Sequence, residues 1–323
     1  EELHLLAKLV RGLGSQNIDH RTRHADFANT AGAGKARWLG LPIAALSSLQ
    51  RVLVVGSFLR KDHPLFAQRI RQAARKGAQV HSLHALADDW LMTVGTRLVA
   101  APSAWLQSLA DIAAAVAAAK GVAAPAAGNP GAEATAIAQS LLSGERKAVL
   151  LGNAAAQHPQ AGTLLALANW IGAQTGASVG YLSEAANTVG AQLVNAQPGA
   201  GGLNAGQMLS AGSLKAALLL DVEPSVDAAD PAAARAALGK AEMVVVLTAF
   251  KNAALDVADV LLPISPLTAP ASSACTASAA TASTTTSSWR TRSGGCGAGC
   301  RDGSPPWTPP PCRPGTDTVP AGG

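Results

Sequence analysis

The first 274 residues of this 323-residue chain contain no cysteine. Cysteine thiolates are the usual ligands of iron–sulfur clusters, so this part of the chain cannot hold such a cluster. All four cysteines fall in the final segment, 270–323, at Cys275, Cys296, Cys300 and Cys312. A zinc site or disulfides would be alternative uses for them, but the segment has no histidine and consists mostly of Ser, Thr, Ala, Gly and Pro. We therefore expect segment 270–323 to be disordered.

The chain also lacks the run of about 18 apolar residues that a membrane-spanning helix needs. Its longest candidate, residues 109–119, is mostly alanine and includes Asp111. The first residues carry neither the basic n-region nor the apolar h-region of a signal peptide. We expect no transmembrane segment and no export signal.

Charge is scarce, at 14% of residues against 48% hydrophobic, and this balance is typical of a folded globular protein. The net charge of +5 is unevenly placed, because residues 1–80 hold 13 Lys+Arg against 5 Asp+Glu and residues 81–270 hold 8 against 13. A basic half can indicate nucleic-acid binding, but basic residues interleaved with aromatics are missing. Four of the cations, Arg69, Arg71, Arg75 and Lys76, fall on one expected helix. A solvated helix face or a protein contact explains them better, and we expect no nucleic-acid partner.

Residues 51–84 form the clearest structural unit of the sequence. Val52 to Val55 is an uninterrupted apolar run, as expected of a parallel strand buried on both faces, and Gly56 allows a turn after it. Pro64 suits the first turn of a helix, and Gly77 suits its end. A strand, a crossover helix and a second strand within this length make a βαβ unit.

The same pattern recurs twice. Residues 148–182 repeat it with a strand, a glycine, a His-Pro pair and a helix, and a looser copy begins at Ala216. The fold class predicted is therefore α/β, with repeated βαβ units and parallel sheets covered by helices. We expect strands near 52–56, 78–83, 148–151, 216–220 and 243–247, and helices near 64–76, 103–119 and 160–174. The side chains predicted to be deeply buried are Leu53, Val55, Ile70, Leu150, Leu167, Leu219 and Val245.

These units suggest four divisions of the chain. Residues 1–123 form a first α/β region, 124–145 a linker and connecting helix, 146–269 a second α/β region, and 270–323 the low-complexity tail. The chain opens on an amphipathic helix, Leu3 to Leu13, with no strand before it, although the units begin with strands. We interpret the first region as truncated at its N-terminus.

Candidate binding residues follow from this architecture, because ligands of doubly wound sheets lie at the carboxyl ends of the strands. Gly56, Ser57, Gly152, Asn153, Asp221 and Glu223 occupy such positions. A turn after a strand needs Gly, Asn or Asp in any case, so a structural role is the alternative for each.

Two loops invite other interpretations. The polar segment 14–27 includes Asp19 and His20, but no metal-ligand spacing on one helix face is present, so we interpret it as a loop whose side chains bond the backbone. The glycine-rich stretch 198–202 has no lysine in P-loop spacing. We expect neither a metal site nor a phosphate cradle.

Several phrases resemble the molybdopterin oxidoreductase superfamily over about residues 1–266. They are Asn17-Ile18-Asp19-His20 followed by Arg23, the strand at Val52 to Val55 with its glycine and proline-started helix, and the run 258–263. VLVVGSFLRKDHPL (52–65) and DDWLM (88–92) most resemble a group within it, the large iron–sulfur subunits, or G subunits, of bacterial NADH-quinone oxidoreductase, respiratory complex I.

The resemblance implies a cofactor-free scaffold. The large iron–sulfur subunits hold their clusters in a cysteine-rich N-terminal region that is absent here, and the loop continues to His24-Ala25 where catalytic members often have Cys-His. Asp19, His20 and Arg23 are then vestigial candidates, with no catalytic residue, no metal and no bound molybdopterin expected. The tail, 270–323, does not resemble the family, and we interpret it as a shifted reading frame.

We therefore expect a non-catalytic part of the respiratory complex that supports electron transfer from NADH to quinone. Its partners would be other subunits, and it would lie at the cytoplasmic side of the bacterial inner membrane, touching the membrane only through them. The alternative is a pterin- or nucleotide-dependent oxidoreductase, which rests on fold analogy alone.

Overall fold

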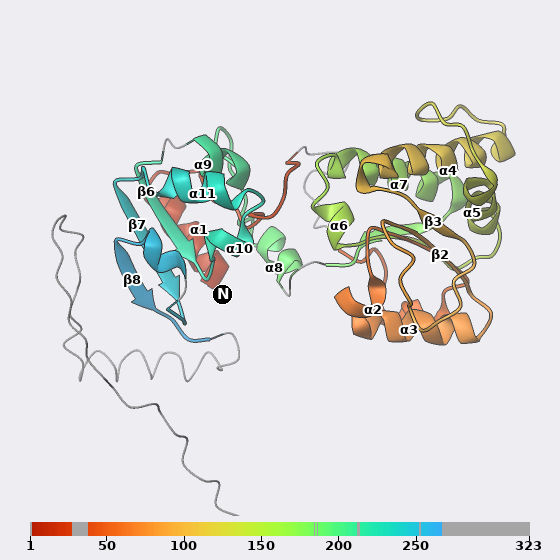
Figure 1. Cartoon of the computed structure of the whole chain (residues 1–323), viewed down its shortest axis with the longest axis horizontal. Coiled ribbons are helices and arrows are strands. Elements are labelled where there is room, and N and C mark those ends of the chain that lie inside the picture. Colours follow the sequence, from red (N-terminus) through yellow and green to blue (C-terminus); the bar gives the residue numbers. More distant parts are fainter. Residues whose placement is uncertain are drawn as a thin grey trace, which may run out of the picture.

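The apolar runs of the sequence form two parallel sheets in the computed structural model (Figure 1). The structure describes residues 2–27, 38–183, 185, 187–211, 214–251 and 253–266. The tail predicted to be disordered, with all four cysteines, lies outside these residues. No helix in the described ranges has the length and apolar character needed to cross a membrane.

The larger sheet has five parallel strands in the order β3-β2-β1-β4-β5, so the predicted parallel α/β fold is confirmed. Its strands are β1 (Arg51–Val55), β2 (Gln79–His84), β3 (Arg97–Val99), β4 (Lys147–Leu151) and β5 (Ser178–Tyr181). The strand order reverses between β1 and β4, because β2 and β3 extend the sheet to one side and β5 extends it to the other. Such a reversal is the usual place for a ligand in this architecture.

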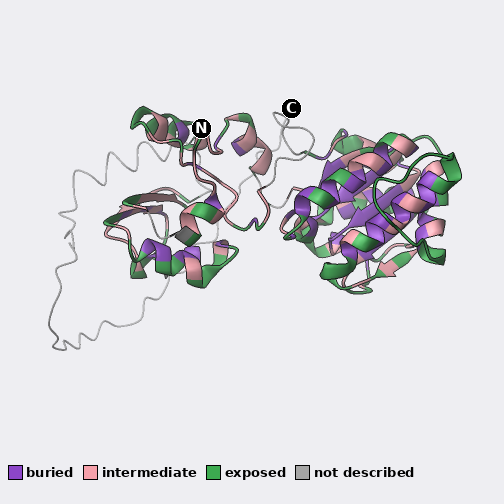
Figure 2. Cartoon of the chain, turned by 90° about the horizontal axis from the view of Figure 1, so that it is seen from above, coloured by how far each residue is buried: buried purple, intermediate pink, exposed green. Residues whose placement is uncertain are grey.

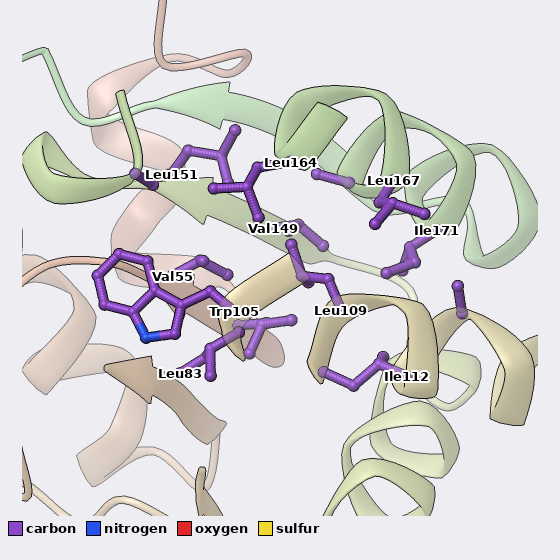
Figure 3. Packing of buried hydrophobic residues seen from close by; sticks show 14 of the residues in the cluster. Val55, Leu83, Trp105, Leu109, Ile112, Val149, Leu151, Leu164, Leu167 and Ile171 are labelled. Carbon is purple, nitrogen blue, oxygen red and sulfur yellow. The ribbon is translucent and has the colours of Figure 1, made fainter. Parts of the chain in front are cut away.

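The uninterrupted apolar run of β1 is explained by helices on both faces of the sheet. Val52 and Val54 pack against Ile70 of α3 (Pro64–Arg75) and against Leu46 of the short helix η1 (Ile43–Ser48). The alternate residues, Leu53 and Val55, enter a second core. That core is built by α4 (Trp105–Lys120), α5 (Ala132–Leu142) and α7 (Ala161–Thr175) (Figure 3). Five predicted core residues, Leu53, Val55, Ile70, Leu150 and Leu167, are buried as expected.

The smaller sheet has three parallel strands in the order β6-β7-β8, with one face covered better than the other. They are β6 (Ala216–Leu220), β7 (Met243–Thr248) and β8 (Val260–Pro263). Val244 and Val246 are buried against Leu238 of α11 (Pro231–Leu238). Around this sheet lie α1 (Glu2–Gly12), α9 (Ala205–Ala211), α10 (Pro224–Asp227) and η3 (Ala253–Asp256) (Figure 1).

The predicted deep burial of Leu219 and Val245 is wrong, because both side chains are only partly buried. Leu219 lies on the end strand β6, which has a neighbouring strand on one side only among the described residues. Val245 points to the less covered face of β7. Figure 2 shows the buried residues concentrated around the five-stranded sheet, with far fewer around the three-stranded one.

The five-stranded sheet takes strands from both sides of the predicted connection at 124–145. The chain passes through α4 and α5 and returns to place β4 directly beside β1. The opening helix α1 packs instead near α8 (Thr188–Leu193), where Ala7 shares a small core with Ala191. The strand-and-helix pattern in the sequence carries no information on which strand pairs with which, so the predicted divisions and the observed sheets differ.

A buried histidine joins β2 and the residue just before β3 to α5. His81 of β2 is 4% exposed, and its Nδ1 accepts a hydrogen bond from the Thr96 amide at 3.2 Å. Its Nε2 must then carry the proton, which it donates to the Ser140 hydroxyl at 2.8 Å. Ser140 in turn donates to the Gln79 side chain at 2.8 Å. The hydrogen bonds of His81 therefore require its neutral ring, in which one nitrogen accepts and the other donates.

This arrangement predicts a loss of stability in mild acid. Burial lowers the pKa of His81 below its ordinary value, and the nearby Arg51 lowers it further. The unfolded chain then binds a proton at higher pH than the folded chain does, so stability falls as pH drops below about 6.5. The loss contributed by His81 should be at most about 1.4 kcal/mol per pH unit.

Urea unfolding between neutral pH and mild acid, compared with His81→Gln, checks this expectation. The variant should be less stable at neutral pH but show a shallower decline, because it has no ring to protonate. Parallel declines for the two proteins would show that His81 does not carry the effect.

Candidate functional site

The loop after α1 is held in place by its own side chains. The Asp19 side chain is fully buried, and its carboxylate accepts bonds from the Arg21 guanidinium at 2.8 and 2.9 Å and from the Ala205 amide at 3.1 Å. Asn17 accepts a bond from the Leu203 amide at 2.8 Å. These contacts engage both oxygens of the Asp19 carboxylate and are typical of a structural loop.

A second ion pair joins this loop to α10. Arg23 donates to Asp227 at 2.6 Å, with side chains 52% and 30% exposed. The other oxygen of Asp227 accepts a bond from the Glu223 amide at 2.9 Å, at the start of the helix. Glu223 itself accepts a bond from the Ser225 hydroxyl at 3.2 Å. The predicted candidate Glu223 therefore lies at the N-terminus of α10, and the predicted candidate Arg23 bonds Asp227, the last residue of that helix.

A polar cavity of about 400 Å³ collects four of the predicted residues. His20 and Arg23 enter it from the first loop, Asn153 from the end of β4, and Asp221 from the end of β6. Asp221 is exposed and adopts the left-handed backbone region at φ 50°, which Asn and Asp tolerate better than other non-glycine residues. Other polar lining residues, which sequence reasoning missed, are Arg21, Thr22, Gln157, Asn187, Thr188 and Asp227.

The remaining candidates lie where the strand order reverses, and there they form a closed contact. Ser57 is fully buried and donates to Asp62 at 2.9 Å. A Cβ added to Gly152 would come within 2.3 Å of the Ser57 Cβ, so the two backbones meet with no space between them. Gly56 has φ 66°, and a Cβ there would lie 2.6 Å from the Ala155 amide. These three residues lock the ends of β1 and β4 together.

Trp105, at the first position of α4, fills the space beside the contact between Ser57 and Gly152. Its indole is 1% exposed and donates to the Ala100 carbonyl at 2.9 Å. The rings of His84 and His158 lie on it, each with centroids 6.0 Å away, and Leu83 and Leu151 complete the packing (Figure 3). The space beside Gly56 at the reversal point is thus occupied by core side chains, whereas Asn153, next to Gly152, lines the cavity.

The close contact between Gly152 and Ser57 predicts that a larger residue at position 152 lowers the stability of the fold. Gly152→Ala should destabilise the chain by about 1 to 3 kcal/mol, because the new methyl group meets Ser57 and the Gly56 carbonyl, 2.7 Å away. Gly12→Ala is the matched control, since nothing lies within 4 Å of a Cβ there. Equal melting temperatures for Gly152→Ala and the unaltered chain would show that the junction is loose.

One histidine near the cavity, His63, has a lowered pKa. Burial lowers the pKa of His63, and this outweighs the opposing influence of the Asp62 carboxylate and the neighbouring Asn153 side chain. His63 is therefore expected to be neutral at physiological pH.

The charges of the cavity do not suit an anionic cofactor. Arg21 is neutralised by Asp19 and Arg23 by Asp227, while Asp221 adds an exposed negative charge. In the described ranges no group of three or more His, Cys, Asp or Glu is placed to hold a metal ion. The glycine-rich stretch 198–202 is filled by the Gln16 backbone, which lies 2.3 Å from a Cβ built on Gly202. The donor set therefore does not fit a pterin dinucleotide or its metal.

Residues 1–268 match the family model of molybdopterin oxidoreductases. The chain belongs to this family. Two curated relatives, the G subunits of NADH-quinone oxidoreductase from Mycobacterium bovis and Mycobacterium tuberculosis, are each 29% identical to it over 301 residues. The match covers 84% of this chain and 35% of each relative, so the chain spans about a third of the relatives' length. The predicted resemblance to the large iron–sulfur subunits is confirmed.

One solved structure has limited similarity to this member of the molybdopterin oxidoreductase family. It is the formyltransferase/hydrolase complex from Methylorubrum extorquens in complex with methylofuran, with a TM-score of 0.46 and 18% identity. The superposition covers 72% of this chain and 66% of that one. A similarity of this extent carries no information on ligand or activity.

Proposed function

We propose that this chain is a non-catalytic scaffold within a subunit of a respiratory NADH-quinone oxidoreductase. It would support electron transfer from NADH to quinone by shape and contact, without turnover of its own. The observation that carries the proposal is the reversal point of the large sheet, where Trp105 and the contact between Ser57 and Gly152 occupy the usual ligand crevice. The similarity to the two mycobacterial G subunits is the reason for proposing this complex.

The proposal includes the absence of a working cofactor in these residues. The paired arginines and the exposed Asp221 speak against a pterin dinucleotide, and residues 1–274 offer no thiolate for a cluster. Electron carriers would then lie in other parts of the complex. The partners would be other subunits, at the cytoplasmic side of a bacterial inner membrane, with membrane contact made only through them.

A second candidate is a pterin- or nucleotide-dependent oxidoreductase. The observation in its favour is the cavity of about 400 Å³, which falls within the size range of small-molecule sites. His20, Arg23, Asn153 and Asp221 would be its binding residues. The two candidates differ in what they expect of His20 and Arg23, which line the cavity on one loop.

Turnover of the assembled complex containing His20→Ala and Arg23→Ala separates them. Both residues are partly exposed, so the double variant should fold, and a scaffold predicts NADH:quinone turnover per assembled complex within about twofold of the unaltered complex. A general acid or base at His20 predicts a loss of about 100-fold or more. A loss of that size, at equal amounts of assembled complex, would overturn the scaffold proposal.

A further inference from the structure

In the part of the chain that the structure describes, half of the backbone groups of the end strand β6 have no hydrogen-bond partner. The Lys215 carbonyl accepts from the Glu242 and Met243 amides, and the Asp221 amide donates to Leu247, so odd-numbered residues of this strand face β7. Because backbone groups of alternate residues point to opposite edges, the amides and carbonyls of Ala216, Leu218 and Leu220 point away from β7. No hydrogen bond from a described residue reaches them.

These unpaired groups lie along an apolar groove of about 560 Å³. Residues 216–220 all line it, and successive strand residues point to opposite faces, so the groove follows the free edge of β6 and opens to both faces of the sheet. Leu6 and Val10 of α1 and Met208 of α9 contribute its other apolar walls. Unpaired backbone groups in apolar surroundings are unfavourable, and a strand that pairs with them removes the penalty.

The shape and chemistry of the groove select an extended segment. A strand added beside β6 would bond three amides and three carbonyls through its own backbone, and it would place alternate side chains toward the two sides of the sheet. The five residues of β6 offer an edge of about 16 Å at the usual rise per residue. Only Asp19 and His20 bring ionisable side chains to the groove, so the matching segment is uncharged and apolar.

The undescribed parts of this chain do not have that chemistry. Residues 28–37 hold no large apolar side chain, and residues 267–323 hold only Leu267, Trp289, Trp307 and Val319, far apart and among Ser, Thr, Gly and Pro. We propose that the groove along β6 binds an extended apolar segment from outside these 323 residues, which joins the sheet as a fourth strand. The inference does not depend on the proposed function.

Residue-resolved amide exchange tests the proposal on the intact chain. The probe is a short capped peptide of alternating Val and Thr, and the control is the same peptide with alternate backbone amides N-methylated, which keeps its apolar character but removes its donors. At saturating peptide, exchange of the Leu218 and Leu220 amides should slow by about tenfold or more, as paired edge amides become protected. The Leu219 amide, which already faces β7, should not change.

Each other outcome contradicts strand addition from outside the chain. Equal protection by the N-methylated peptide would indicate hydrophobic adsorption. Leu218 and Leu220 amides already as slow as Leu219 in the chain alone would show that the chain covers its own edge, and protection lost on dilution would show that a second copy does.

A variant gives a second readout. Leu218→Pro removes one edge amide and leaves the bonds to β7 in place, so peptide affinity should fall by about threefold to tenfold. If Leu218→Pro does not fold, the exchange experiment on the unaltered chain still decides.

Discussion

Replacing Trp105 with alanine is expected to destabilise the chain by about 3 to 5 kcal/mol. Trp105 is 1% exposed, packs against two histidine rings and fills the space beside Gly56, so its removal leaves a large cavity and an unpaired Ala100 carbonyl. A loss of this size is a large share of the roughly 5 to 15 kcal/mol that stabilises a typical domain.

Trp38→Ala is the matched control, since the same side chain is 51% exposed there. It should cost clearly less in chemical denaturation of the two variants side by side. Similar losses for Trp105→Ala and Trp38→Ala would show that the crevice beside β1 and β4 is not a packed core.

Removing the buried carboxylate of Asp19 should be of similar severity. Asp19→Ala leaves the Arg21 guanidinium buried without its partner and frees the Ala205 amide, and breaking a buried ion pair typically costs about 3 to 5 kcal/mol. In the assembled complex the variant should lower the yield and leave turnover per complex unchanged.

Asp227→Ala breaks an equivalent Asp–Arg pair that is partly exposed. It should cost only about 1 kcal/mol, because solvent screens the charges and the main loss is the bond to the Glu223 amide. Thermal melts of the two variants check the comparison. An Asp19→Ala melting temperature no lower than that of Asp227→Ala would contradict the structural role given to Asp19.

The local elements of this fold were readable from the sequence because their signals are local. Val52 to Val55 and residues 148–151 predicted fully buried strands, and Pro64 and Gly77 predicted the limits of a helix, which spans Pro64–Arg75. Pairing is not local. Nothing in the sequence of β4 specifies β1 as its neighbour, so the five-stranded sheet crosses the predicted connection at 124–145.

The prediction of deep burial failed for strands that few other described elements pack against. Leu219 and Val245 lie in runs as apolar as that of β1. The described elements around the three-stranded sheet, however, cover one of its faces incompletely. The strength of an apolar run shows that a strand can be buried, while the number of elements packed on it decides whether it is.

The sequence pointed to several residues of the cavity but not to how their side chains pair. The rule that ligands lie at the carboxyl ends of strands led to Asn153 and Asp221, and the structure brings both to one cavity with His20 and Arg23. The same rule led to Gly56 and Gly152, which instead lock two strands together. Trp105, which fills the crevice, carries no sequence signal for that role, because its packing depends on the strand order.

The molybdenum and tungsten content of the chain, purified from cells that make molybdopterin, tests the central claim most directly. A scaffold whose arginines are already paired and whose crevice is filled predicts far less than one metal atom per chain, both for the unaltered protein and for the variant with His20→Ala and Arg23→Ala. Close to one molybdenum or tungsten atom per chain in the unaltered protein, lost in the double variant, would contradict the account and establish a cofactor site in the cavity.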